Sequence, residues 1–160
     1  MLTQLVFIGR IFLVITRATE CAIRALLYLA MHPKGQIVYK KDICRSQNVT
    51  PAFLTKILQP LIKNGIVGSQ RGVGGGFFLL LDPSEVTLLD VIQSQEGPIL
   101  LNRCLGASET CERSGICPVK NVWQEANRNL TDLLAGFDFL MLAGLERYRK
   151  KEDEDSDCRK

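Results

Sequence analysis

The chain has 160 residues, of which 46% are hydrophobic, a composition that excludes a fully disordered protein and suffices for one folded domain with an extension. Its net charge of +3 is unevenly distributed: residues 1–81 carry ten Lys and Arg against two acidic residues, whereas residues 82–160 carry ten against fifteen. A basic first half indicates a polyanionic partner. The six cysteines are scattered over helical patterns, one loop and a charged tail, which argues against a disulfide framework and for a reducing cytoplasm.

Residues 1–14 form an N-terminal extension of undefined role. An apolar run covers residues 5–15 and is interrupted by Gly9 and Arg10. The run is too short to span a bilayer, and no small-residue cleavage site separates it from the helix that follows. We therefore expect no membrane role, and interpret the extension as a docking segment or as the product of a start codon placed too far upstream.

Three helices are predicted in the first half of the chain. The first covers residues 16–31, and the second covers residues 39–46 after a strand-like piece at residues 36–38. Asn48 tolerates the left-handed conformation that the following turn needs. Thr50 as N-cap and Pro51 as first helical residue then start the third helix, which ends at Gly65.

Two short strands follow, at residues 66–70 and 77–81, joined by the sequence RGVGGG. This link lacks the Gly-Lys-Ser/Thr ending of a P-loop and lies between strands, so nucleotide binding is disfavoured. A capping box of Thr87 and Asp90 begins a fourth helix over residues 88–95. Three helices followed by a hairpin are the order of a winged helix-turn-helix, which makes residues 15–97 a mainly α DNA-binding domain with a two-stranded wing.

The third helix and the hairpin tip carry the predicted DNA-binding residues. These are Thr50, Ala52, Thr55, Lys56 and Lys63 from the helix, and Arg71, Gly72 and Val73 from the tip. In a winged helix the third helix lies in the major groove, where threonine hydroxyls reach base edges and lysines neutralise phosphates. Arg71 suits a narrow minor groove, and the glycines beside it permit a close approach of the backbone.

Residues 98–117 form a loop that contains three cysteines, Cys104, Cys111 and Cys117. Since Pro118 follows directly, we expect Cys117 at the N-cap of a helix, where the helix dipole favours a thiolate. Three chemistries compete: zinc, which normally takes four Cys or His ligands in paired spacings; a disulfide switch, which needs two thiols; and an iron–sulfur cluster. We favour the cluster, because clusters are held mostly by thiolates and tolerate a different ligand at one position.

A long helix is predicted over residues 118–149. Its apolar residues repeat in alternating steps of four and three, the spacing of a helix-pairing seam. The seam consists of Val119, Trp123, Ala126, Leu130, Leu133 and Phe137. It can pack on its own domain or pair with a second copy of the chain as a dimerisation helix. The pattern loosens at residues 136–139, where we expect a break and a short final helix, and the charged tail of residues 150–160 is expected to be disordered.

The chain resembles the IscR/NsrR group of the Rrf-two (Rrf2) family of bacterial winged-helix regulators. The matching pieces are ITRATE at residues 15–20, residues 22–30, Phe53-Leu54, LIKNGIV at residues 61–67, RGVGGGF at residues 71–77 and the three-cysteine loop. The resemblance implies a homodimer on a palindromic operator in double-stranded DNA. It also implies one iron–sulfur cluster per protomer, 2Fe–2S or 4Fe–4S, held by Cys104, Cys111 and Cys117.

The fourth ligand and the operator are where the chain departs from the best-known members. In some members an acidic residue of the partner's first helix completes the site, which matches Glu20; Lys120 stands where others have a His ligand. Glu20 is therefore the expected fourth ligand, with a solvated carboxylate at a helix start as the alternative. The gap between the first two cysteines is one residue longer than usual, and Thr55 replaces an acidic base-reading residue.

Together these features predict a cytoplasmic transcriptional regulator whose operator affinity is switched by a cluster that senses redox state, nitric oxide or iron–sulfur status. The chain shows no nucleophile–base pairing and no nucleotide loop, so an enzyme is not expected. One alternative is a winged-helix repressor that senses a thiol or a ligand without any cluster. A less favoured alternative is an iron–sulfur electron carrier, against which the basic first half argues.

Overall fold

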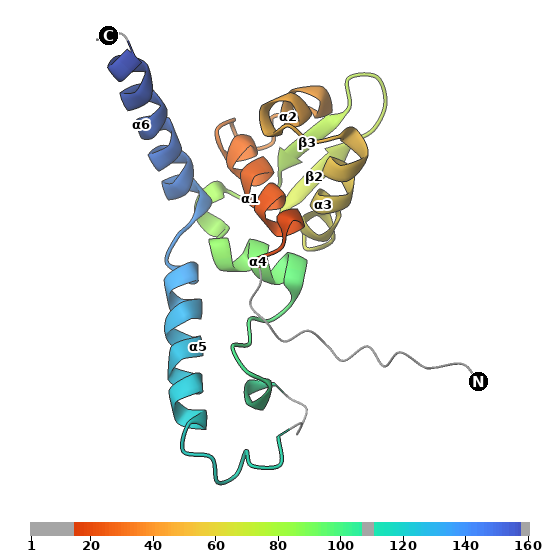
Figure 1. Cartoon of the computed structure of the whole chain (residues 1–160). Coiled ribbons are helices and arrows are strands. Elements are labelled where there is room, and N and C mark those ends of the chain that lie inside the picture. The colour runs from red at the N-terminus through yellow and green to blue at the C-terminus, as the bar shows by residue number, and fades with distance from the viewer. Residues whose placement is uncertain (1–14, 107–110, 158–160) are drawn as a thin grey trace, which may run out of the picture.

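The computed structural model describes residues 15–106 and 111–157; the extension at residues 1–14 and Cys158 lie outside the described residues. In chain order the elements are α1 (Arg17–Ala30), β1 (Val38–Tyr39), α2 (Lys40–Gln47), α3 (Pro51–Lys63), β2 (Val67–Gln70), β3 (Gly76–Leu79), η1 (Pro83–Glu85), α4 (Leu88–Glu96), η2 (Arg103–Leu105), α5 (Lys120–Ala135) and α6 (Phe139–Asp157). This order confirms the predicted winged helix-turn-helix. Figure 1 shows α5 and α6 as a column beside that domain.

Local capping signals start α3 and α4 at the predicted positions. The Thr50 hydroxyl accepts the Phe53 N–H at 3.3 Å, with Pro51 as the first residue of α3. At the start of α4, Thr87 and Asp90 exchange side-chain and backbone hydrogen bonds, which completes the capping box. Asn48 ends α2 in the left-handed conformation, with φ of 51°. The turn between α2 and α3 is therefore as the sequence predicted.

The sheet contains one strand more than the predicted two-stranded wing. Its order is β1-β3-β2, and β1 pairs antiparallel with β3 through Val38 opposite Phe77 and Tyr39 opposite Gly76. Glycine is required at this point, because a Cβ on Gly76 would lie 2.0 Å from the carbonyl oxygen of Val38. The two residues of β1 thus tie the wing to the segment that precedes α2.

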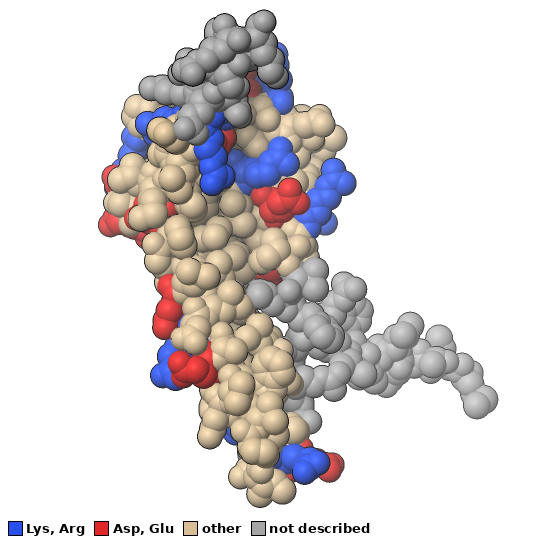
Figure 2. Space-filling model, turned by 60° about the vertical axis from the view of Figure 1, so that its left-hand side comes forward, with Lys and Arg blue, Asp and Glu red and all other residues tan. Residues whose placement is uncertain are grey.

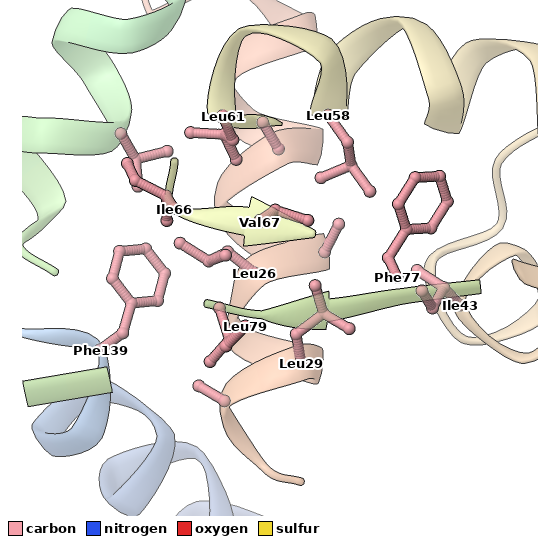
Figure 3. Close-up of a cluster of buried hydrophobic side chains, with 14 of the residues drawn as sticks. Leu26, Leu29, Ile43, Leu58, Leu61, Ile66, Val67, Phe77, Leu79 and Phe139 are labelled. Atoms are coloured by element: carbon pink, nitrogen blue, oxygen red, sulfur yellow. The ribbon is translucent and has the colours of Figure 1, made fainter. Parts of the chain in front are cut away.

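One apolar core joins α1, α3 and the sheet (Figure 3). Fully buried side chains include Leu26, Leu29, Ile43, Leu54, Ile57, Leu58, Leu61, Val67, Val86, Val91 and Phe139. Phe139 comes from the first turn of α6, and Ala143 one turn later is also fully buried. The final helix therefore helps to close the core of the DNA-binding domain, a contact that the sequence analysis did not anticipate.

The C-terminal part differs from the prediction in length. The predicted break is present, since α5 ends at Ala135 and α6 begins at Phe139, but α6 is 19 residues long rather than short. The tail predicted to be disordered from Lys150 is helical as far as Asp157. Oppositely charged side chains one turn apart favour a helix here, as do Lys150 and Glu146, whose charged atoms lie 2.7 Å apart. Within the described ranges, no helix is both long and apolar enough to cross a membrane.

Candidate nucleic-acid interface and cysteine loop

Helix α3 turns one face to the core and the other to solvent. Leu54, Ile57, Leu58 and Leu61 are buried, and Phe53 is half-buried, in keeping with the predicted core face. The opposite face carries Ala52, Lys56, Gln59 and Lys63, all exposed, at steps of three or four residues. With Thr55, Pro60 and Ser94 of α4, these residues line a shallow hollow of about 650 Å³. This is the surface on which the sequence placed base and phosphate contacts.

The two threonine hydroxyls predicted to reach base edges also serve the helix itself. Thr50 accepts the N–H of Phe53, and Thr55 donates to the carbonyl oxygen of Pro51 at 2.9 Å. The Thr55 hydroxyl is therefore left only as an acceptor. The sequence did not predict the hydrogen bond from Thr55 to Pro51. Gln59, on the same face, was not among the predicted DNA-binding residues.

The wing tip presents a cation on a backbone that only glycines allow. Arg71 and Val73 are exposed, and Gly72 and Gly74 have φ of 97° and 83°, which L side chains rarely adopt. Beside the wing loop, where Tyr39 pairs with Gly76, the Lys41 ammonium lies 5.6 Å from the centre of the Tyr39 ring, a cation–π distance. A lysine of α2 thereby adds positive charge beside the tip. Lys and Arg side chains also gather over the upper part of the molecule in Figure 2.

The cysteine loop is held by backbone turns and one lysine. Cys104 lies in η2, and Cys104, Cys111 and Cys117 are free, half-buried thiols. The Lys120 ammonium donates to the Ser114 hydroxyl at 2.7 Å, which ties the start of α5 to the segment between the last two cysteines. In the described ranges, which leave out residues 107–110, no three Cys, His, Asp or Glu side chains are grouped closely enough to hold a metal ion.

The expected N-cap position of Cys117 is wrong. Helix α5 begins at Lys120, and its N-cap residue is Val119, which makes no side-chain cap. The reason is a turn ahead of the helix: the Lys120 N–H donates to the carbonyl oxygen of Cys117 at 3.2 Å. Pro118 lies within this turn, where its missing N–H is not needed. Cys117 therefore lies three residues before the first residue of α5.

Glu20, Cys21 and Cys44 lie outside this loop in the single chain. Glu20 is exposed in the first turn of α1, with its carboxylate 3.8 Å from the Arg24 guanidinium. Cys21 is buried in the core. Burial raises the pKa of the Cys44 thiol, against a smaller opposite effect of Lys40, so this thiol stays protonated at neutral pH.

A network of hydrogen bonds connects the end of α4, just before the cysteine loop, with α1 and α3. The Glu96 carboxylate accepts the Thr16 hydroxyl at 2.6 Å and the hydroxyl of Thr19, which is fully buried. Burial alone would raise the pKa of Glu96, but these hydrogen bonds outweigh it and lower the pKa. The Gln95 side-chain amide donates to the carbonyl oxygen of Ile57 in α3 at 2.7 Å. The sequence offered no signal for these contacts.

The apolar seam of α5 is not covered by the chain's own domain. None of the residues in α5 is buried, and Leu133 is 59% exposed. The rest of the predicted seam, namely Val119, Trp123, Ala126, Leu130 and Phe137, is exposed or half-buried. Figure 2 shows mainly uncharged side chains running down this side of the molecule.

Comparison with known proteins gives a consistent result. The model of the Rrf2 family, described as an iron-dependent transcriptional regulator, matches residues 15–144. The HTH-type transcriptional regulator IscR of Photorhabdus laumondii is 32% identical over 123 residues, covering 77% of this chain and 72% of that protein. IscR of Xenorhabdus nematophila is 28% identical over 147 residues, covering 91% and 89% of the two chains.

Solved structures share the fold. CymR, the global cysteine regulator of B. subtilis, superposes with a TM-score of 0.68 at 24% identity, covering 84% of this chain and 98% of that one. IscR of T. potens superposes with a TM-score of 0.62 at 22% identity, covering 84% and 88%. At these identities the likeness concerns the fold alone.

Proposed function

The chain belongs to the Rrf2 family of transcriptional regulators, and from this premise we propose that an iron–sulfur cluster on Cys104, Cys111 and Cys117 sets its affinity for operator DNA. Relatives named IscR are DNA-binding regulators and not enzymes, and this chain shares their fold and their regulatory class. The observation that carries the proposal is the presence of three free, half-buried thiols in the loop directly before α5. A cytoplasmic location and a redox, nitric oxide or iron–sulfur signal belong to the same proposal.

The donor set fits a cluster better than zinc. Structural zinc takes four Cys or His ligands, but the single histidine of the chain, His32, lies at the end of α1, where its ring contacts the carbonyl oxygen of Tyr28 at 2.8 Å. Iron–sulfur clusters are held mostly by thiolates. When bound, one 2Fe–2S or 4Fe–4S cluster per protomer would cross-link the loop. Glu20 from a second copy of the chain would complete the ligand set, and its exposed carboxylate, paired only loosely with Arg24, is suited to that contact.

A homodimer formed through α5 is part of the proposal. The exposed apolar seam supports it, because an apolar stripe with a spacing of three and four residues is the pattern by which helices pair. A two-fold pair presents two α3 helices, so the operator would be palindromic.

On the operator, α3 would lie in the major groove and the wing tip over the minor groove. Ala52 and the acceptor lone pairs of Thr50 and Thr55 would face base edges, while Lys56 and Lys63 would neutralise phosphates. At the tip, Arg71 would enter the minor groove, with Gly72 and Val73 against the backbone. The exposure of these side chains, half-buried Thr55 excepted, supports the assignment.

Hydrogen bonds between α4 and α3 would transmit a change in the loop to the DNA-binding helix. The Asn64 side-chain amide at the end of α3 donates to the Ser94 hydroxyl at 2.8 Å, and the Gln95 amide donates to the Ile57 carbonyl in the same helix. The loop leaves from the end of α4, so its cross-linking would change how firmly α4 holds α3. A coupling of about 1–3 kcal/mol would change operator affinity by roughly 5- to 150-fold.

A regulator that senses a thiol or a ligand without a cluster is the second candidate. It is favoured by the absence of a metal-binding group of three side chains among the described residues, since a disulfide switch needs only two thiols. The fold likeness to CymR, a cysteine regulator, agrees with this alternative but does not carry it at 24% identity.

Iron and acid-labile sulfide content, with Mössbauer and visible spectra, distinguishes the two candidates. Protein purified without oxygen is expected to be brown and to contain iron and sulfide, whereas the variant with Cys104, Cys111 and Cys117 all replaced by serine is expected to be colourless. Cys44→Ala is the matched control, because it removes a thiol outside the loop and should keep the colour. A colourless wild-type protein, or a brown triple variant, would reject the cluster.

A further inference from the structure

We propose that Gln59 reads an adenine through its major-groove edge and so determines part of the operator sequence. The inference deepens the proposed function, because it rests on the placement of α3 in the major groove. Gln59 lies two turns after Ala52 and one turn after Thr55 and Lys56 on the exposed face of α3. Homeodomains read bases from side chains that recur at this spacing along one helix face, so α3 can reach bases beyond its first turn.

The Gln59 side chain can offer both a hydrogen-bond donor and an acceptor to DNA. Among the residues that the structure describes, its side-chain amide has no hydrogen-bond partner, and it borders the hollow beside Lys56 and Lys63. The Thr55 hydroxyl already donates a hydrogen bond to the carbonyl oxygen of Pro51. The two lysines offer donors alone. Within α3, Gln59 is thus the side chain that keeps both a donor and an acceptor available.

The chemistry of a glutamine amide selects one base. Adenine presents an N7 acceptor and an N6 donor in the major groove, and a glutamine amide pairs with both at once. Guanine presents two acceptors there and cytosine one donor, so neither uses both ends of the amide. The flanking lysines neutralise phosphates on either side, which holds the helix close enough for this contact.

The test is selection from a randomised duplex DNA library by the full chain, wild type against Gln59→Ala and Gln59→Glu. Wild type is expected to select adenine at one position of each half-site. Gln59→Ala should select the same bases as wild type at all other positions and lose the preference for adenine at this one. Gln59→Glu should prefer cytosine at this position, because the cytosine N4 donates to a carboxylate. In titrations with the selected duplex, an adenine analogue without N7, which removes one of the two hydrogen bonds, should weaken wild-type binding roughly 2- to 13-fold and leave Gln59→Ala unaffected.

Two control variants test whether the change in base preference is specific to Gln59. Gln36→Ala removes an exposed glutamine outside α3 and should select as wild type does. Lys63→Ala removes a phosphate contact and should weaken all duplexes equally with a smaller salt dependence. If Gln59→Ala keeps the wild-type preference at every position, or behaves like Lys63→Ala, Gln59 is not a reader. If wild type binds no duplex selectively, the proposed function fails together with the inference.

Discussion

Replacing Glu96 with alanine is expected to lower the free energy of unfolding by about 1.5–3 kcal/mol, the range for a hydrogen bond to a charged group. Glu96 accepts the hydroxyls of Thr16 and Thr19, and Thr19 is fully buried. The variant would leave the Thr19 hydroxyl with a single weak partner, the Thr16 hydroxyl at 3.2 Å. The bonds to Thr16 are exposed and add little, so the estimate rests on the Thr19 contact.

The companion variant Thr19→Val should cost less, about 1 kcal/mol, because it fills the same space and leaves an exposed carboxylate that water can solvate. In a double-mutant cycle of Glu96→Ala with Thr19→Val, the two effects should therefore not add, with a coupling of about 1 kcal/mol. Glu112→Ala removes an exposed carboxylate elsewhere and should leave stability within about 0.5 kcal/mol of wild type.

The effect of Glu96 should also depend on pH. Because the folded state lowers the pKa of Glu96, its stabilisation is fully present above the usual glutamate pKa of about 4.3 and is lost as the pH falls through the lower folded value. The stability difference between wild type and Glu96→Gln should accordingly be full at neutral pH and shrink in acid. Urea denaturation followed by circular dichroism measures both effects. A Glu96→Ala variant as stable as wild type, or a difference that grows in acid, would refute the reasoning.

Three further perturbations test separate parts of the structure. Gly76→Ala should lower stability by about 1–3 kcal/mol in thermal unfolding, since its Cβ meets the Val38 carbonyl oxygen at 2.0 Å, while Gly115→Ala, with nothing within 4 Å, should not. Leu133→Glu should shift the sedimentation coefficient from dimer to monomer with an unchanged circular dichroism spectrum; a variant that stays dimeric would exclude the α5 seam. Arg71→Ala should weaken binding more on duplexes with A·T-rich flanks than on G·C-rich ones in competition assays; equal weakening would rule out a minor-groove contact.

Signals that act within a few residues predicted most of the winged helix. Thr50 with Pro51, Thr87 with Asp90, and Asn48 each fix a helix end through their own backbone neighbours, and the structure has them as expected. The break between α5 and α6 was predicted in the same way from the loosened pattern at Gly136, and the hairpin of β2 and β3 from the glycine-rich link between them. These elements need no knowledge of distant contacts.

Contacts between distant segments were not predictable in the same way. The sequence predicted a strand-like piece at residues 36–38, but not that β1 joins the wing by pairing Val38 with Phe77. Phe139 enters the core because α6 packs against α1. The start of α5 was misplaced because Pro118 suits a turn as well as a first helical residue. For the cysteine loop, the sequence predicts three candidate ligands, and among the described residues no three possible ligands are grouped closely enough to hold a metal ion.

In the proposed mechanism, the contact between α4 and α3 would let the loop influence DNA binding. Gln95 and Ser94 hold α3 from the helix that leads into the cysteine loop. Weakening this contact with Gln95→Ala should reduce the difference in affinity between the two states of the loop without removing the cysteines.

The most direct test is the operator dissociation constant, measured by fluorescence anisotropy without oxygen, for the same protein with its cluster intact and after chelation of the iron. We predict values that differ at least about fivefold, with the triple serine variant of Cys104, Cys111 and Cys117 matching the iron-free protein. Equal dissociation constants for the two forms would contradict the claim that these thiols control DNA binding through a cluster.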